Sequence, residues 1–514
     1  MLNNRIIKLI GLGCLFLAVF LAYSPSLFHV ARADQLWFLA EYAGRDNSIQ
    51  TLSDSLFYDR TRHFSPGNPQ LFRPFFFLIL TVQRIGFGYE FFYWQLVSLL
   101  AHIFSIWALW RLLSSWTERS VKVKSWAFLF VIFFAFLFAN VEAVIWHHIT
   151  PYVFFAGVVL VAFERMDVFV LSSGRDRGAL WACSALLLMA VLTYEVGLLY
   201  SGCFFIYSLL ELRGTGRVRW SLVLLMPLAM YCCLSIGHWM LMNVQADQEG
   251  ALILNKVISV STLSNFFIVL KLFLFSGFFL QPLDVLPELR VSLVKDTLSW
   301  LWPLNVWVLS RWVGAGLFVA FGCLVAYRLR YYKLTNELAR ILLVCAMLTG
   351  YLFMIVAGRV NVRTEVSLVN TIYYDYNFWI LFTVLLFLLM GELVSFVSST
   401  RFLVFIFSLL VIMFSFNNAR NIYAFTTVIK NDALISRTFL RALDKFITEH
   451  KNESDFSFSF AADDPYNVPL IWRRNKGLPI LKRSLVHSLY PQYYVVQNPK
   501  YLLYSDIWEN TGHF

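Results

Sequence analysis

Charged residues are scarce in this chain of 514 residues. Asp, Glu, Lys and Arg make up 14% of it, whereas roughly a quarter is usual for a soluble domain. This scarcity excludes a soluble globular or disordered protein. Hydrophobic residues account for 59% of the chain, and several runs reach the roughly 20 uncharged residues that span a bilayer. The sequence therefore predicts an all-α polytopic membrane protein.

The chain also lacks several common signatures of catalysis and metal binding. It has no Walker-type glycine loop, no GxSxG, no internal repeat, no heptads and no low-complexity segment. All seven cysteines fall in apolar stretches, without the spacing of metal ligands or of a disulfide framework. We therefore predict no zinc site and assign no metal ligand or cofactor, leaving dependence on a divalent metal open.

The net charge of +11 comes from Lys and Arg residues that sit mainly in short links between apolar runs. This distribution is typical of the positive-inside rule and not of a nucleic-acid-binding surface. We place five basic links in the cytoplasm: the N-terminus, 111–124, 165–177, 213–219 and 328–340.

Alternation between these links predicts about eleven transmembrane helices, with an uncleaved first span, the N-terminus inside and the C-terminus outside. The predicted spans are 6–24, 89–110, 126–139, 149–164, 179–193, 196–210, 220–243, 299–327, 341–358, 377–397 and 402–424. Parity leaves 262–281 as an in-plane or re-entrant helix on the outer side. We expect a transmembrane domain over 1–424 and a small extracytoplasmic module over 425–514.

The long outer loop 24–73 is the first candidate for function, because long ordered links in compact domains are often functional. Asp34 places a carboxylate just beyond the first span, and Arg73-Pro74 ends the loop. Proline suits the first turn of a helix and disfavours helical geometry for Arg73. A cation beside a helix N-terminus is suited to phosphate. The alternative is that both residues only cap helices.

Two further outward links carry acids. Asn140-Val141-Glu142-Ala143-Val144-Ile145-Trp146-His147-His148 holds Glu142 close to the bilayer edge, where an unpaired carboxylate is costly. Thr193-Tyr194-Glu195 repeats the arrangement one hairpin later. Three hairpins thus bring an acid to one face. For the neighbouring His and Tyr residues, a place in an aromatic belt at the membrane interface is the alternative.

The order of these motifs over residues 1–210 resembles the GT-C glycosyltransferases, closest to the protein O-mannosyltransferase and TMTC-type branch. The shared features are an Asp after the first span, the Arg-Pro helix start, His102 in Leu99-Leu100-Ala101-His102, and the Val-Glu-Ala-Val-Ile-Trp and Tyr-Glu hairpins. That branch commonly carries paired acids in the first loop. Here Ala33 and Gln35 flank Asp34, which weakens a two-carboxylate metal site.

The resemblance implies a polyprenyl-phosphate-linked sugar donor and an extracytoplasmic acceptor, which is a glycan, a lipid or a protein. Asp34 is the candidate base for inverting transfer, with Glu142 as the second catalytic candidate. The departing lipid phosphate needs fixed cationic or hydrogen-bonding groups. The substrate-binding candidates are Arg73, His147, His148, Glu195, Lys271, Arg359, Arg363, Tyr373 and Tyr374.

Three other functions stay open at this point. A polysaccharide polymerase or ligase of another membrane fold would carry its long outer loop late in the chain. A lipid or solute transporter would need a central polar pathway and often inverted repeats. A non-enzymatic scaffold would act through the C-terminal module. We favour the bacterial inner membrane, because neither a retention signal nor a loop rich in glycosylation sites stands out, and we place the active site on the periplasmic side.

Overall fold

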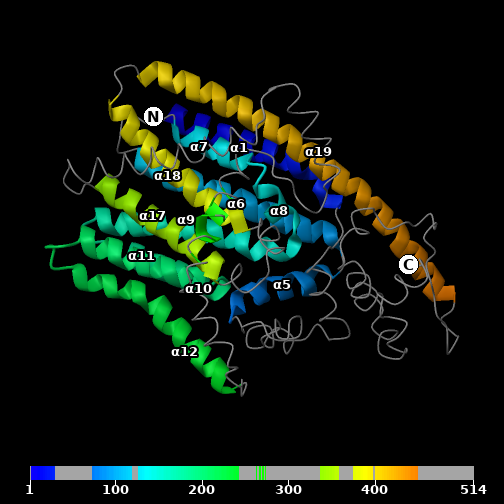
Figure 1. Cartoon of the computed structure of the whole chain (residues 1–514), viewed down its shortest axis with the longest axis horizontal. Helices are drawn as coiled ribbons and strands as arrows, with labels where there is room; N and C mark the ends of the chain where they lie inside the picture. Colours follow the sequence, from blue (N-terminus) through cyan, green and yellow to red (C-terminus); the bar gives the residue numbers. More distant parts are fainter. Residues whose placement is uncertain are drawn as a thin grey trace.

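The computed structural model describes residues 2–28, 72–88, 90–117, 126–241, 336–357, 374–396 and 400–449, with isolated residues between 262 and 273. Within this part of the chain, regular secondary structure consists of helices alone, and the helices run alongside one another (Figure 1). Five of them are long and apolar enough to cross a membrane: Leu9–Phe28, Phe91–Thr117, Val218–Gly237, Glu337–Ile355 and Val404–Thr427. The predicted all-α membrane fold is therefore confirmed, whereas the count of about eleven spans stays a prediction.

Most helices overlap the predicted apolar runs, but the helix over Pro74–Phe87 lies between the predicted spans 6–24 and 89–110. In chain order they are α1 (Leu2–Tyr23), η1 (Ser24–Phe28), α5 (Pro74–Phe87), α6 (Phe91–Thr117), α7 (Trp126–Ala135), α8 (Asn140–Ile145), η3 (His147–Ile149), α9 (Thr150–Leu171), α10 (Arg177–Thr193), α11 (Val196–Glu211), η4 (Val218–Leu225), α12 (Met226–Leu241), α17 (Asn336–Ile355), α18 (Asp375–Phe396) and α19 (Thr400–Glu449). The predicted span 299–327 and most of 262–281 lie outside the described residues.

The segment predicted to cross at 126–139 is shorter than expected. Helix α7 ends at Ala135, and its 10 residues rise about 15 Å, half of the roughly 30 Å hydrocarbon core. A polar side chain accompanies the break: Asn140 Nδ2 donates to the carbonyl of Phe134 at 2.7 Å. The chain then turns into α8 and η3 inside the bundle. We call residues 136–149 the Glu142 hairpin; nearly all of them are buried.

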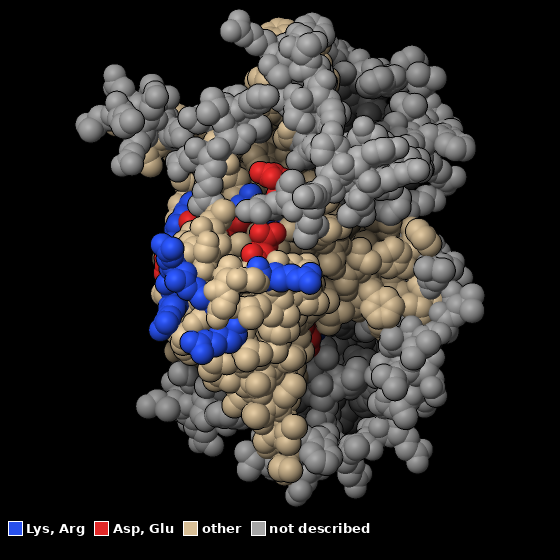
Figure 2. All heavy atoms as spheres, turned by 90° about the vertical axis from the view of Figure 1, so that its left-hand side faces the viewer, with Lys and Arg blue, Asp and Glu red and all other residues tan. Residues whose placement is uncertain are grey.

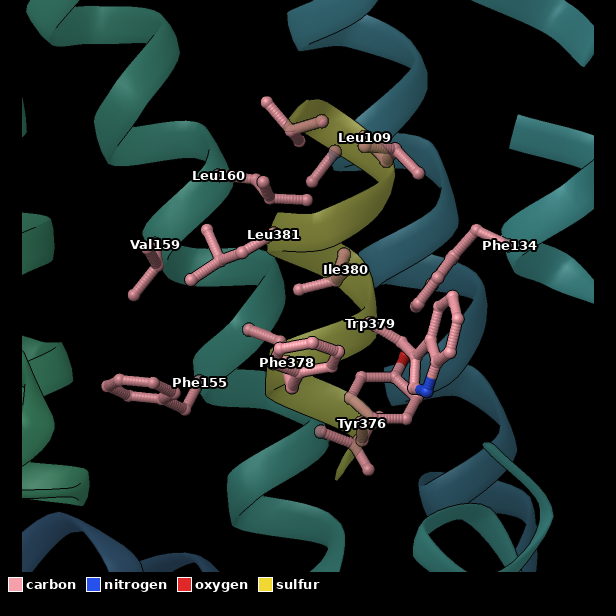
Figure 3. Close-up of a cluster of buried hydrophobic side chains, with 14 of the residues drawn as sticks. Leu109, Phe134, Phe155, Val159, Leu160, Tyr376, Phe378, Trp379, Ile380 and Leu381 are labelled. Atoms are coloured by element: carbon pink, nitrogen blue, oxygen red, sulfur yellow. The ribbon is translucent and has the colours of Figure 1, made fainter. Parts of the chain in front are cut away.

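Helices α6 and α9 pack directly against each other in the core, and α18 packs across both (Figure 3). Its first turns carry Tyr376, Phe378 and Trp379, all buried. Trp379 donates its indole N–H to the carbonyl of Phe273 at 2.9 Å. Close packing of these large side chains fixes the start of α18 at Asp375, directly after Tyr374.

A buried ion-pair cluster joins the helices at one end of the bundle. Arg340 of α17 makes a bidentate contact with Asp167 of α9, with N···O distances of 2.8 to 2.9 Å. Trp116 also donates to Asp167 at 3.1 Å, and Arg111 pairs with Glu164 at 2.6 Å. We call this end of the bundle the Arg340 end.

The described parts of the predicted basic links gather at the Arg340 end. Arg217 donates to the carbonyl of Ser173 at 3.1 Å, which ties the 213–219 link to the 165–177 link. Lys and Arg side chains cluster on the face seen in Figure 2, the left-hand side of Figure 1. Their placement on the cytoplasmic side of the membrane stays a prediction.

Helix α19 runs through the predicted domain boundary at 424/425. Its 50 residues correspond to about 75 Å of rise, more than twice the hydrocarbon thickness. It continues past the other helices at the C-terminal end of the described chain (Figure 1). Residues 450–514 lie outside the described part, so the extracytoplasmic module stays a prediction.

The turn between α10 and α11 depends on a close backbone approach at Gly197. A Cβ there would lie 2.6 Å from the Val191 nitrogen and 2.8 Å from its Cα. Backbone atoms cannot rotate away, so Gly197→Ala should destabilise the protein by about 1–3 kcal/mol. Gly202→Ala on the same helix is the control, because a Cβ there meets nothing within 4 Å. Thermal unfolding in detergent measures both; equal melting temperatures would rule out the tight turn.

Candidate functional site

The centre of the candidate site is a buried ion pair between Arg73 and Glu195. Arg73 Nε lies 2.6 Å from Glu195 Oε1, and Nη2 lies 2.7 Å from Oε2. This fork geometry is the strongest form of an arginine–carboxylate contact. Arg73 is only 7% exposed, and the side chain of Glu195 16%. The sequence placed these residues on the same face, and the structure brings them into direct contact.

Three tyrosines enclose this pair. Arg73 Nη1 donates to the Tyr152 hydroxyl, and the guanidinium lies over the Tyr194 ring at 5.0 Å from its centroid. Tyr152 packs edge-on against Tyr194 at 4.7 Å and contacts Tyr374 at 5.8 Å. The cage draws its residues from the loop before α5, from α9, from the α10–α11 link and from the start of α18.

The electrostatics of the cage keep Arg73 charged and Tyr194 neutral. Burial alone would lower the pKa of Arg73, but the Glu195 carboxylate and Tyr152 more than offset it and the pKa is raised. Burial raises the pKa of Tyr194, and Tyr374 raises it further. The cage therefore holds a charged guanidinium beside the neutral phenol of Tyr194.

Local backbone geometry explains the position of Arg73. Pro74 occupies the first position of α5, and Arg73 has φ −129° and ψ 62°, outside the helical region, as the sequence predicted. Its carbonyl accepts from the amide of Phe77 and so starts the helix. The guanidinium is thereby held beside a helix N-terminus instead of within a helix.

Arg73 retains capacity for a further ligand. A guanidinium has five N–H donors, and three of them serve Glu195 and Tyr152. Two N–H groups have no partner within the described part of the chain. An anion that approached them would meet a guanidinium already oriented by Glu195.

Glu142 lies on α8 at the same end of the bundle and is 6% exposed. Its hairpin is held by α6, where Gln95 and Ser98 both donate to the carbonyl of Val144. His147 is fully buried and stacks on Phe91 with ring centroids 6.3 Å apart. His148 contacts Trp146, which fits either a substrate contact or the aromatic-belt alternative.

His102 lies deeper in α6. Its Nδ1 lies 2.8 Å from the Tyr376 hydroxyl and its Nε2 3.4 Å from the carbonyl of Ala135. It also packs against Tyr23 and Phe134. His102 therefore links α6, α7 and α18 as a hydrogen-bonded core residue.

Several predicted site residues lie outside the described part of the chain: Asp34, Lys271, Arg359, Arg363 and Tyr373. Their roles stay predictions. Of the remaining candidates, the structure brings together Arg73, Glu195 and Tyr374, and it places Glu142 and His147 in the adjoining hairpin. It places His148 there too, half-buried.

Tyr152 was not predicted from the sequence, and Asp375 was noted only as part of the segment Tyr373-Tyr374-Asp375-Tyr376. Tyr152 follows Pro151 in the first turn of α9, and nothing in its neighbours distinguishes it from a belt tyrosine. Asp375 starts α18 and is fully buried. An acid inside a Tyr-rich segment was the available signal, because a buried carboxylate at a membrane depth is costly.

The site end of the bundle lies opposite the Arg340 end. Tyr152 and Asp167 are both on α9, fifteen residues apart, which corresponds to about 22 Å of helix rise. Among the described residues, no group of three or more His, Cys, Asp and Glu is arranged to hold a metal ion. The described site can bind an anion and orient hydroxyl groups.

No protein-family model matches the sequence, and no curated protein matches it. Among solved structures, the crystal structure of ArnT from Cupriavidus metallidurans in the apo state is similar at 15% sequence identity. The alignment covers 98% of this chain and 92% of that chain, with a TM-score of 0.41. A similarity of this size assigns no activity to the chain.

Proposed function

We propose that this protein is an integral membrane glycosyltransferase that moves a sugar from a polyprenyl-phosphate donor to an extracytoplasmic acceptor, with inversion at the anomeric carbon. The acceptor is a hydroxyl of a cell-envelope glycan, a lipid or a protein. The inner membrane of a bacterium is the proposed location, with the active site on the periplasmic side.

The observation that carries the proposal is the buried Arg73–Glu195 pair in its tyrosine cage. A guanidinium held beside the N-terminus of α5, with two N–H groups that no described residue accepts from, suits the phosphate of an amphiphilic donor. It lies at the end of apolar helices, so a polyprenyl chain can stay in lipid while its phosphate reaches the cation. A purely structural ion pair would need neither the spare donors nor the adjoining buried Glu142.

The chemistry proposed for these residues is a single displacement. The acceptor oxygen attacks the anomeric carbon, the bond from that carbon to the phosphate oxygen breaks, and the phosphate leaves with the electron pair. Asp34 takes the proton of the acceptor hydroxyl as the new bond forms. Arg73 stabilises the charge that develops on the phosphate. Glu142 orients the acceptor from the hairpin, with His147 beside it.

The remaining candidates complete this assignment. Lys271, Arg359 and Arg363 are proposed as further phosphate contacts, and Tyr373 as a partner of Tyr374 in the cage. Glu195 orients Arg73. Metal dependence stays open in this proposal, and Asp34 without an adjacent acid offers one carboxylate only.

The proposed topology predicts that the C-terminal tail and the 24–73 loop share one side of the membrane. A cysteine introduced at Ser457 should react with an impermeant thiol reagent in right-side-out inner-membrane vesicles. The matched control is Gly214→Cys, in the exposed link at the Arg340 end, which should react only in inverted vesicles. The reverse labelling pattern would overturn the topology.

A deletion strain tests the proposed function in the cell. Loss of the enzyme should remove one sugar from an envelope glycan, lipid or protein and raise the level of its polyprenyl-phosphate-linked donor. Mass spectrometry of lipids and released glycans measures both, and it names the sugar and its attachment point together. Unchanged levels of both the lipid-linked donors and the glycosylated products would count against a glycosyltransferase.

A further inference from the structure

Helix α6 carries a row of four buried polar side chains in an otherwise apolar segment. Gln95, Ser98, His102 and Ser105 follow one another at intervals of three, four and three residues, which places them on one face of the helix. All four are fully buried. Lipid cannot satisfy such groups, so their partners inside the protein show what the row is for.

The first two members of the row converge on one atom. Gln95 Nε2 donates to the carbonyl of Val144 at 3.0 Å, and Ser98 Oγ donates to the same oxygen at 2.6 Å. Val144 lies two residues after Glu142 in α8. Ser105 instead donates to the carbonyl of Val153 at 2.8 Å, within the continuous helix α9.

These two carbonyls differ in their need for a donor. The last four carbonyls of a helix have no intrahelical partner, and α8 ends at Ile145 with Trp146 in extended geometry at ψ 98°. The buried carbonyl of Val144 therefore has no amide donor from within α8. Val153 lies well inside α9, where the helix supplies the usual amide donor. Gln95 and Ser98 therefore stabilise the end of the short helix α8. Ser105 adds a bond to α9, which its own backbone hydrogen bonds already stabilise.

We infer that Gln95 and Ser98 are positioning residues that fix the Glu142 hairpin for sugar transfer through the Val144 carbonyl. This role rests on the proposed function, because Glu142 is the group being positioned. The two bonds fix the end of the single turn that carries Glu142. They act from the same helix that stacks Phe91 on His147, so both sides of the hairpin are tied to α6.

The experiment compares Gln95→Leu/Ser98→Ala with Ser105→Ala in the full-length protein. Ser105→Ala removes the same hydroxyl from the same face of the same helix. Hydrogen exchange of the amides of residues 140–148 should rise about tenfold in the double variant and stay unchanged in Ser105→Ala. The kcat of transfer should fall about ten- to a hundredfold, with the KM for the polyprenyl-phosphate sugar unchanged. Ser98→Ala alone should shift both readouts in the same direction by less.

Three results would overturn the inference. Exchange that stays unchanged would mean that the two side chains do not hold the hairpin. Faster exchange with normal kcat would mean that the hairpin geometry does not matter for transfer. An equal effect of Ser105→Ala would reduce the role to general packing of α6. Absence of transfer by the wild-type protein would instead contradict the proposed function, while exchange would still report whether the hairpin is held.

Discussion

Asp34→Asn is expected to lower sugar transfer by at least about a hundredfold. Asn keeps the size and hydrogen-bonding capacity of the side chain but cannot accept the proton of the acceptor hydroxyl. A general base typically contributes about 10²–10⁴ in rate. The variant should insert and fold normally and should still bind the lipid donor. Single-turnover transfer with purified protein measures the loss.

Two further acids provide controls for Asp34. Glu41→Gln, on the stretch that follows Asp34, should be nearly silent. Glu142→Gln should reduce transfer less than Asp34→Asn, because Glu142 is assigned to the acceptor and not to the proton. If Asp34→Asn kept more than about a tenth of the activity while Glu142→Gln abolished it, the base would be Glu142.

Arg73→Lys should lower kcat by about a hundredfold although it conserves charge. Lys presents a point charge on a flexible stem and loses the planar fork that Arg73 places on Glu195 and, by our proposal, on the donor phosphate. Removal of one preorganised donor to developing charge commonly costs about 10²–10³ in rate. Rates are measured per folded protein, since loss of a buried pair also destabilises by about 3–5 kcal/mol when one partner is deleted.

Arg340→Lys separates stability from catalysis. Arg340 is as buried as Arg73, at 7% exposed, and it makes the same bidentate contact with an acid, Asp167. It lies at the opposite end of the bundle from the tyrosine cage. Both Lys variants should melt at lower temperature, but only Arg73→Lys should lose kcat. Near-normal transfer by Arg73→Lys would leave Arg73 as a structural partner of Glu195.

Local patterns in the sequence were sufficient for much of the fold. Apolar runs predicted the helices because a long uncharged segment is stable in the hydrocarbon core of a bilayer. Arg73-Pro74 predicted a helix start, because proline has no amide N–H and the first position of a helix does not use one. The structure confirms this start. Basic links predicted which helix ends lie together, and the Arg217–Ser173 contact agrees.

Contacts between residues far apart in the chain could not be predicted from the sequence. Arg73 and Glu195 are 122 residues apart, and their contact depends on how α5, α9 and α10 pack. The early end of α7 also depends on one side-chain contact, from Asn140 to the Phe134 carbonyl. Helix α19 continues past 424 because a helix satisfies its own backbone and does not need an apolar surface to propagate. The end of an apolar run therefore indicates where the membrane span ends and does not indicate where the helix ends.

Transfer by the purified protein tests the central claim most directly. The protein is reconstituted into liposomes with polyprenyl-phosphate-linked sugars and with envelope glycan and lipid acceptors, and free polyprenyl phosphate is measured together with the glycosylated product. We predict equal amounts of both, an anomeric configuration opposite to that of the donor, and loss of both with Asp34→Asn. Donor that remains intact with every sugar tested, or release that Asp34→Asn does not reduce, would contradict the account.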